Sequence, residues 1–277
     1  MTQAPWNRGD DGSFHPTEYA RSGWSDDMVN GPALVGLAAL NLELEYRVDG
    51  FVPARFTADL FRAAHRVPTS VRTQVVRDGR RIRIAECDIV QAGVVVARAS
   101  VVQYRKSGPP PGQEWVAPDN SFAPLAGVVA TGAAYFVGSD DAGWGGSVGM
   151  GDGVDAHQNA SRKRVYHRAA ELVAGEPASP FVRAIVAAEA TSLVTNLGTE
   201  GIGYINGDLT VALSRLPVGD YIGLQADSHW CADGVSVGSS TLFDDVGPFG
   251  IGMVTALANP AAQIDFGRLD PGPTLQV

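Results

Sequence analysis

Residues 30–44 read NGPALVGLAALNLEL, and this stretch decides which folds are open to the chain. Asn30-Gly31-Pro32 is typical of a helix start, because proline is tolerated in the first turn. The run from Ala33 to Leu44 is apolar on nearly every side, so the predicted helix is buried and not laid on a surface. Some other part of the chain must therefore cover this helix all round.

The segments that follow this helix have the pattern of an antiparallel meander. Residues 55–62 alternate, with Phe56, Ala58 and Leu60 on one face. Three more strands are predicted at 71–77, 80–88 and 94–104, separated by turn signals at Asp78-Gly79 and at 91–93. An antiparallel sheet of this kind has one face to bury, and the buried helix supplies the partner for that face.

The second half of the chain repeats the same plan. Ser179-Pro180 starts a helix predicted to run to about Asn196, followed by strands at 209–215, 221–228, 235–243 and 249–257. The repeat is marked by three matches in the same order: TADLFR at 57–62 with TVALSR at 210–215, Asp78-Gly79 with Asp233-Gly234, and Gly93 with Gly247. This indicates duplication of a whole helix-plus-meander unit.

We therefore predict an α+β protein of the double hotdog type. Two antiparallel sheets each wrap a long buried helix, and the two sheets join into a continuous one. The predicted organisation is an N-terminal hotdog at 1–106, a proline-rich linker at 107–127 and a C-terminal hotdog at 128–277. The glycine-rich stretch at 132–153 fits either strands or an ordered loop.

Composition and charge argue against several classes of protein, among them nucleic-acid-binding and membrane-spanning proteins. The 277 residues carry a formal net charge of −9, which argues against nucleic acid as the main partner. No apolar stretch is long enough to span a membrane, and the N-terminus lacks the pattern of a secretory signal, so a cytoplasmic location is expected. Cys87 and Cys231 are far apart and are expected to be reduced thiols, and neither has a ligand partner at zinc-site spacing.

Glu189 is the most informative candidate for chemistry. It interrupts an otherwise apolar row spaced by four along the second predicted helix, formed with Phe181, Ile185, Leu193 and Leu197. Burial would raise the pKa of this carboxyl toward the range of a general base. The alternative is that the row drifts around the helix and that Glu189 reaches solvent.

Other candidates have ordinary structural explanations as well. Asn206-Gly207 is a turn signal, but Asn206 could also orient a water molecule beside Glu189. Asn30 and Gly31 open the first helix, whose free N–H groups could stabilise an oxyanion or could simply be capped. The glycine-rich run 145–151 lacks the Lys-Ser/Thr ending of a phosphate loop. The histidines follow no recognisable nucleophile motif, and there is no Gly-x-Ser-x-Gly elbow.

With these motifs in order, the chain resembles the type II acyl-CoA thioesterase family, in particular its actinobacterial thioesterase-like members. The segments that carry the resemblance are 29–31, 77–80, 175–180, 187–190, 205–211, 215–221 and 247–250. The resemblance implies a double hotdog and hydrolysis of acyl-CoA thioesters, with no cofactor and no metal. A homo-oligomer is also plausible, since hotdog proteins commonly assemble through their sheets.

The family's catalytic set is an Asp on the second helix, a Thr or Asn before the next strand and a Gln on the last strand, which together activate a water. Here the Asp position falls on Glu189 and the Thr/Asn position on Asn206. The Gln position falls on Val254, whose side chain cannot hydrogen-bond a water. By the same resemblance Asn30, Gly31 and Val254 are expected to contact the substrate. The basic run 162–164 is usually just solvated surface, but it could meet the phosphates of coenzyme A.

Three functions remain open at this point. The first is an acyl-CoA thioesterase that uses Glu189 and Asn206. The second, suggested by Val254, is a non-catalytic protein that binds acyl-CoA or another acyl ligand. The third is a hotdog hydratase, which ranks last because that chemistry usually needs a His–Asp pair and no histidine lies near Glu189 or Asn206 in sequence.

Overall fold

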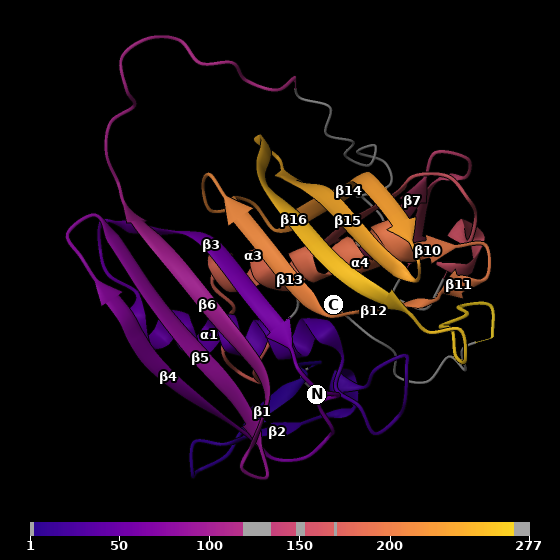
Figure 1. Cartoon of the computed structure of the whole chain (residues 1–277), viewed down its shortest axis with the longest axis horizontal. Helices are drawn as coiled ribbons and strands as arrows, with labels where there is room; N and C mark the ends of the chain where they lie inside the picture. Colours follow the sequence, from indigo (N-terminus) through magenta and orange to yellow (C-terminus); the bar gives the residue numbers. More distant parts are fainter. Residues whose placement is uncertain (1–2, 119–133, 148–152, 169–170, 269–277) are drawn as a thin grey trace.

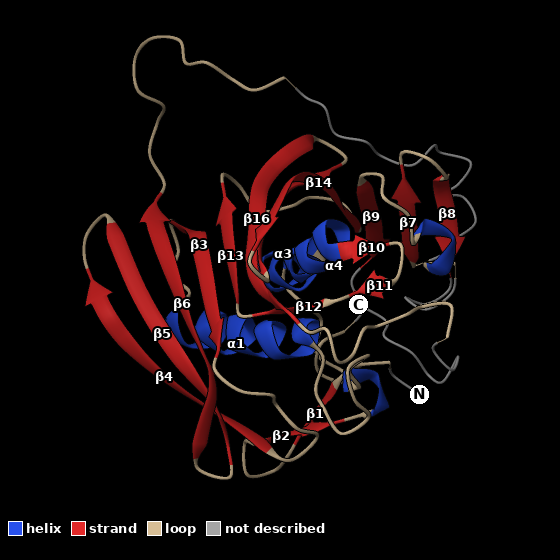
Figure 2. Ribbon diagram, turned by 45° about the vertical axis from the view of Figure 1, so that its right-hand side comes forward, coloured by secondary structure: helices blue, strands red, loops and turns tan. Residues whose placement is uncertain are grey.

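The computed structural model describes residues 3–118, 134–147, 153–168 and 171–268. Two helical units lie on the inner side of a strongly curved antiparallel sheet (Figures 1 and 2). Within the described residues, no helix is long and apolar enough to cross a bilayer. The protein is therefore α+β, with far more strand than helix.

The N-terminal half consists of the first helix and the strands around it. Their bounds are β1 (Trp6–Arg8), β2 (Phe14–Pro16), η1 (Glu18–Ala20), α1 (Gly31–Tyr46), β3 (Phe51–Leu60), β4 (Thr69–Asp78), β5 (Ile82–Gln91) and β6 (Val94–Arg105). The predicted helix and all four predicted strands of this half are present, with ends that differ by a few residues. β1 and β2 were not predicted, and they extend the sheet beyond β4.

The C-terminal half has more elements. They are β7 (Tyr135–Ser139), β8 (Gly143–Ser147), η2 (Asp155–His157), β9 (Lys163–Arg168), α3 (Pro180–Glu189), α4 (Thr191–Asn196), β10 (Leu197–Gly198), β11 (Gly201–Ile202), β12 (Tyr204–Asn206), β13 (Asp208–Leu213), β14 (Tyr221–Ala232), β15 (Val235–Asp244) and β16 (Gly247–Ala258). For the glycine-rich stretch 132–153, the sequence fitted either strands or an ordered loop. Part of it forms strands, because β7 and β8 pair there as a hairpin. Residues 148–152, like much of the predicted linker, lie outside the described residues.

The two halves have the same strand order. In space the first meander runs β4-β5-β6-β3 and the second runs β14-β15-β16-β13, and the two join where β3 pairs with β13 into one continuous sheet. In that ladder Thr57 lies opposite Thr210, the residue that the sequence repeat matches to it. Equivalent residues of two copies face each other in this way only across a local twofold axis. The predicted continuity of the sheet is confirmed, and the register is the one that the predicted duplication would give.

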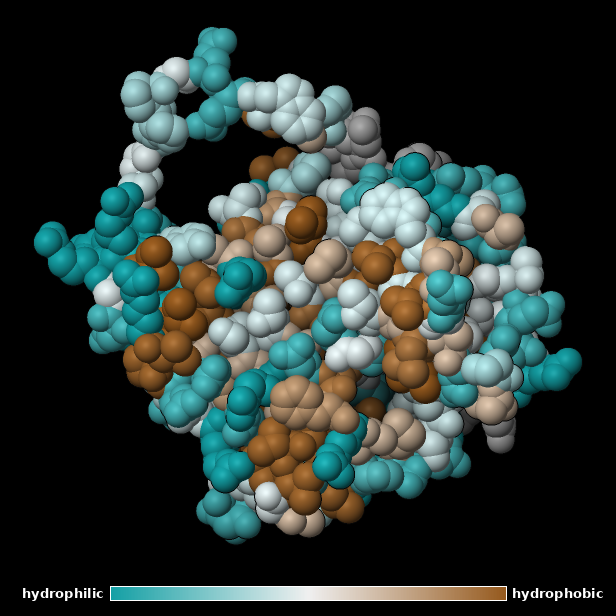
Figure 3. All heavy atoms as spheres, viewed as in Figure 1, coloured by the Kyte–Doolittle hydropathy of each residue, from teal (hydrophilic) through white to brown (hydrophobic). Residues whose placement is uncertain are grey.

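α1 is buried as its sequence requires. Asn30 caps the helix, its Oδ1 accepting a hydrogen bond from the Ala33 N–H at 2.8 Å. Every residue from Pro32 to Leu40 is buried, and so is Leu42, whereas Leu44 in the last turn is 61% exposed, so the predicted burial fails there. The outer face of the sheet, by contrast, carries apolar and polar residues side by side (Figure 3), among them the exposed Ile251 and Met253 of β16.

The second helix is not continuous, so the prediction of a single helix from 180 to about 196 is wrong. Ser179 caps α3 through the Val182 N–H, as expected. The helix then stops at Glu189, because the next N–H, that of Ala190, turns back to the Ala187 and Ala188 carbonyls. This contact to Ala187, three residues back, tightens the last turn and re-aims the chain before α4.

α1 and α3 pack antiparallel, and their closest approach depends on a glycine. A Cβ at Gly36 would lie 2.7 Å from Val186 Cγ2 and 2.8 Å from Leu172 Cδ1. Each helix also brings a carboxylate to the start of the other: Glu189 lies against Gly31 of α1, and Glu43 of α1 accepts a hydrogen bond from the Ser179 hydroxyl. The N-terminal end of each buried helix thus meets a carboxyl group, and the helix dipole favours the ionised form of such a group.

Replacing Gly36 with leucine is expected to lower the free energy of unfolding by about 1–3 kcal/mol, because the added side chain overpacks the α1–α3 contact. Urea denaturation of the variant and of the wild type measures the difference. The control is Gly108→Leu, at a glycine whose added Cβ would meet nothing within 4 Å. Equal stability of the Gly36 variant and this control would show that the helices do not pack as closely as described.

Candidate active site

A cavity of about 410 Å³ opens between the start of α1, the α3–α4 break and the β12 segment. Four of the predicted site residues line it together: Asn30, Gly31, Glu189 and Asn206. They come from distant parts of the chain, and the antiparallel packing of α1 and α3 brings them to one place. The rest of the wall is largely apolar and includes Trp24, Phe61, Leu193, Ile264 and Phe266.

Glu189 belongs to a chain of hydrogen bonds. The Asn206 amide donates through Nδ2 to Glu189 Oε1 at 3.0 Å, and the Ser192 hydroxyl donates to Asn206 Oδ1 at 2.5 Å. Because Ser192 occupies the amide oxygen, the amide nitrogen is directed at the carboxylate. Asn206 therefore does more than form a turn, since its side chain is held against Glu189.

Ser192 was missed by the sequence reasoning. It follows Glu189 by three residues, and side chains three apart on a helix lie on the same face. A search for hydroxyl or amide groups at this spacing from Glu189 would have found it. Its side chain is 7% exposed and lines the same cavity.

The environment of Glu189 raises its pKa to about 8. Burial is the main cause, because it penalises the charged carboxylate, and the hydrogen bond from Asn206 opposes the shift. The other members of its helical row are buried, while Glu189 itself is partly exposed and lines the cavity. The Glu189 carboxyl thus interrupts a row of buried apolar side chains, and it lies at the wall of a pocket.

Gly31 is in contact with this carboxyl group. A Cβ at position 31 would overlap Glu189 Oε1 and Cδ, so no side chain fits here without moving the acid. Asn30 does not offer its own side chain to a ligand: besides capping α1, its amide donates to the Tyr19 and Arg21 carbonyls at 3.0 and 3.3 Å. Asn30 shapes the pocket, and Gly31 leaves room for the acid.

Val254, which was predicted to contact substrate, is not among the residues that line this cavity. Its side chain is fully buried on the inner face of β16, opposite Gly238 of β15. The residue of β16 that pairs with Asn206 is Ala256, two positions further along the strand. Val254 therefore packs beneath the helices and does not line the cavity.

The basic run 162–164 is also not the free surface patch that was considered. Lys163 is 2% exposed, and its ammonium donates to the carbonyls of Asn159 at 2.8 Å and Ser161 at 2.5 Å. Arg164 is 4% exposed and pairs with Asp140. Only Arg162 projects into solvent, so the cluster cannot act as a three-residue phosphate site.

Two histidines meet a serine: His15 Nε2 lies 3.0 Å from the exposed Ser13 Oγ, and His157 Nδ1 lies 3.0 Å from Ser139 Oγ. Ser139 is fully buried and its hydroxyl also receives a hydrogen bond from Asn159, so this pair serves the structure of the β7–β8 region. Among the described residues, no three His, Cys, Asp or Glu side chains come together in a way that could hold a metal ion.

Several solved structures share this fold over nearly the whole chain. The tesB protein of Mycobacterium avium subsp. paratuberculosis is 15% identical, with a TM-score of 0.64 and coverage of 92% of this chain and 96% of that one. The acyl-CoA thioesterase II TesB2 of Mycobacterium marinum is 15% identical, with a TM-score of 0.57 and the same two coverages. A hot dog-fold protein of unknown function from Alicyclobacillus acidocaldarius is 14% identical, with a TM-score of 0.59, again over 92% and 96%.

No curated protein matches the chain. Two family models do: the acyl-CoA thioesterase N-terminal domain matches residues 20–104, and the acyl-CoA thioesterase C-terminal domain matches residues 108–257. The second model alone spans more than half of the sequence, and the resemblance seen in the motifs points the same way. The chain belongs to the acyl-CoA thioesterase family.

Proposed function

We propose that this protein hydrolyses acyl-CoA thioesters with a water molecule activated by Glu189. The observation that carries the proposal is the Ser192–Asn206–Glu189 chain of hydrogen bonds, which ends on a carboxyl group at the wall of an apolar cavity. An acyl chain suits the apolar wall, and a water beside the acid suits the polar end. Family membership makes a thioester the expected substrate.

In this proposal each half of the chain is one hotdog, and the pair forms a double hotdog with boundaries near 1–106, 107–127 and 128–277. The common strand order of the two meanders and the pairing of Thr57 with Thr210 support it. The site then belongs mainly to the second hotdog, and the first contributes the start of α1.

The roles follow from the geometry. Glu189 takes a proton from the water as the water attacks the thioester carbonyl carbon, the C–S bond breaks, and the products are a carboxylic acid and a free thiol. Asn206 holds the acid in place and is within reach of the same water. The Gly31 N–H, at the first position of α1, is the donor we assign to the developing oxyanion, since the Ala33 N–H is already taken by Asn30.

Protonation of Glu189 sets the pH dependence. A general base must be ionised, and a pKa of about 8 leaves most of this carboxyl protonated at neutral pH. The folded state then binds a proton between pH 4.5, the ordinary pKa of the group, and about 8, whereas the unfolded state does not. The free energy of unfolding contributed by this group therefore falls as pH rises through that window.

A second function is favoured by one observation. Val254 stands where the resemblance puts the family's Gln, and it is buried away from the cavity. A water at Glu189 then has one side-chain partner fewer. The corresponding proposal is a protein that binds acyl-CoA without hydrolysing it.

An acyl-CoA panel of short, medium and long chains, read by release of free thiol, separates these two functions. For the thioesterase, Glu189→Gln is expected to lower kcat/KM by about 10²-fold or more, since it removes the base. In the wild type kcat/KM should rise with pH and level off above about 8. Calorimetric binding of acyl-CoA with no thiol release would favour the binder, and an unaltered Glu189→Gln enzyme would contradict the role given to the acid.

The stability of the same two proteins gives an independent check. The wild type is expected to lose free energy of unfolding between pH 5 and pH 8 relative to Glu189→Gln, because only the wild type carries the titrating carboxyl. Urea denaturation at pH 5, 6.5, 8 and 9 measures this difference, and the other titrating groups cancel between the two proteins. A difference that stays constant with pH would mean that the pKa of Glu189 is not raised.

Gly31→Ala is expected to reduce kcat about tenfold or more, because the new methyl group displaces the Glu189 carboxylate from Asn206. The same overlap should lower the free energy of unfolding. Combining Gly31→Ala with Glu189→Asp, which shortens the acid by a methylene, should recover part of that loss. Gly108→Ala, at an open glycine, is the matched control and should behave as wild type. Full activity of Gly31→Ala would show that the acid does not work from this position.

A further inference from the structure

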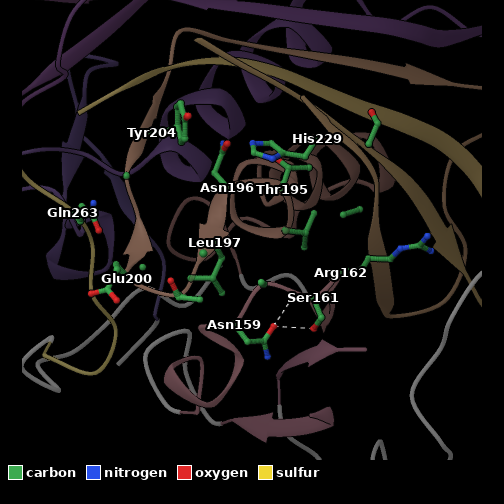
Figure 4. Close-up of a pocket in the computed structure, with 18 of the residues that line it drawn as sticks. Asn159, Ser161, Arg162, Thr195, Asn196, Leu197, Glu200, Tyr204, His229 and Gln263 are labelled. Atoms are coloured by element: carbon green, nitrogen blue, oxygen red, sulfur yellow. Dashed lines mark hydrogen bonds between the residues drawn. The ribbon is translucent and has the colours of Figure 1, made fainter. Parts of the chain in front are cut away.

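Two further cavities lie outside the candidate active site. The larger, of about 540 Å³, carries many polar side chains, Asn159, Ser161 and His229 among them (Figure 4), and it adjoins the active site, because Tyr204 lines both. The smaller, which we name the rear cavity, has a volume of about 240 Å³ and lies at the other end of α1. It shares no lining residue with the active-site cavity, so it is a separate site.

The wall of the rear cavity is largely apolar. Residues 51–53 of β3 contribute to it, and so do Leu42, Val101, Phe181 and Leu216 from other parts of the chain. Such a wall suits an aliphatic chain, because the hydrophobic effect favours each methylene group that leaves water for it. The smaller volume sets a limit on the length of that chain.

Two polar side chains in this wall are held by the protein itself. Glu43 accepts a hydrogen bond from the Ser179 hydroxyl at the start of α3, and the Gln103 amide donates through Nε2 to the Tyr46 carbonyl at 3.0 Å. The Glu43 carboxylate would repel a second anion placed beside it. A ligand with a negative charge therefore keeps this charge away from Glu43, at the open end of the cavity.

The mouth of the rear cavity carries cations. Arg47 and Lys106 line the cavity and are exposed, and neither forms an ion pair within the part of the chain that the structure describes. Arg105 lies opposite Phe51 in the β3–β6 ladder, so the two side chains emerge on the same face of the sheet. Asp49 is the acidic residue of this mouth. The local charge is thus positive, in a chain whose net charge is −9.

We infer that the rear cavity binds a free aliphatic carboxylate, with its chain against the apolar wall and its carboxylate at Arg47 and Lys106. An apolar wall that ends at exposed cations complements a ligand with an alkyl tail and one anionic end. This site does not depend on the proposed hydrolysis, since none of its residues belongs to the candidate active site.

The probe for the test is decanoic acid with a photoreactive diazirine on its chain, and the matching decanol is the uncharged probe. The full chain is irradiated with each probe, and the adducts are located by peptide mapping. The yield on residues 48–53 and on Leu216, measured against probe concentration, gives the affinity of the rear cavity alone. Binding in the active-site cavity is read separately, from adducts on residues 202–207.

Arg47→Glu combined with Lys106→Glu reverses the two exposed cations. The affinity of the rear cavity for the decanoic acid probe is expected to fall about tenfold, because two favourable charge contacts become repulsive. The affinity for the decanol probe should stay that of the wild type. Arg55→Glu combined with Arg162→Glu, at two exposed arginines outside this cavity, is the matched control for net charge and should leave both affinities unchanged.

Adducts confined to the walls of the active-site cavity would overturn the inference. An unaltered affinity of the charge-reversed variant for the decanoic acid probe would also overturn it, and so would an equal loss for both probes, since the cations are assigned to the carboxylate. The assay needs no turnover, so failure of the proposed thioesterase function would leave its result unchanged.

Discussion

The burial of α1 on every side from Pro32 to Leu40 is the constraint on which the rest of the structure depends. A helix with no polar face has to be covered by a sheet and by a second helix, and α3 is that helix. Packing as close as that at Gly36 leaves no space for polar groups along the middle of the pair. Polar chemistry is therefore confined to the helix ends, where backbone N–H groups remain free and a carboxylate can be accommodated.

Glu189 illustrates how this constraint places a titratable carboxyl group beside a cavity. The acid ends α3, where the helix breaks, so it meets the start of α1 on one side and a cavity on the other. Its surroundings raise its pKa to about 8, and the Ser192–Asn206 pair fixes its position. Glu189 and Ser192 lie on either side of the break at Ala190, and both line the cavity.

Much of this could be predicted from the sequence, since it follows from patterns that are local or repeated. The α1 helix, both four-strand meanders and the repeat were legible, and Asn30, Gly31, Glu189 and Asn206 indeed share one cavity. The break at Ala190 could not be predicted from the sequence, because alanine favours a helix and the break is imposed by tertiary packing. β9 is buried on both faces and so lacks alternation. The burial of Lys163 and Val254 depends on strand register across the sheet, which a linear pattern does not contain.

The two halves share one strand order, and in each of them a buried helix begins beside a glutamate of the other helix, but the two contacts differ. At the start of α1 Glu189 is bonded to Asn206 beside a cavity of about 410 Å³, whereas at the start of α3 Glu43 accepts a hydrogen bond from the Ser179 hydroxyl and lines a smaller cavity of about 240 Å³. In a symmetric pair of separate chains, any change to one end would appear at the other as well. Fusion into one polypeptide removes that coupling, so selection can keep one end as a structural clasp while it tunes the other for a ligand. The chain thus has the means to evolve a new substrate preference at one end without losing the contact that holds its helices together.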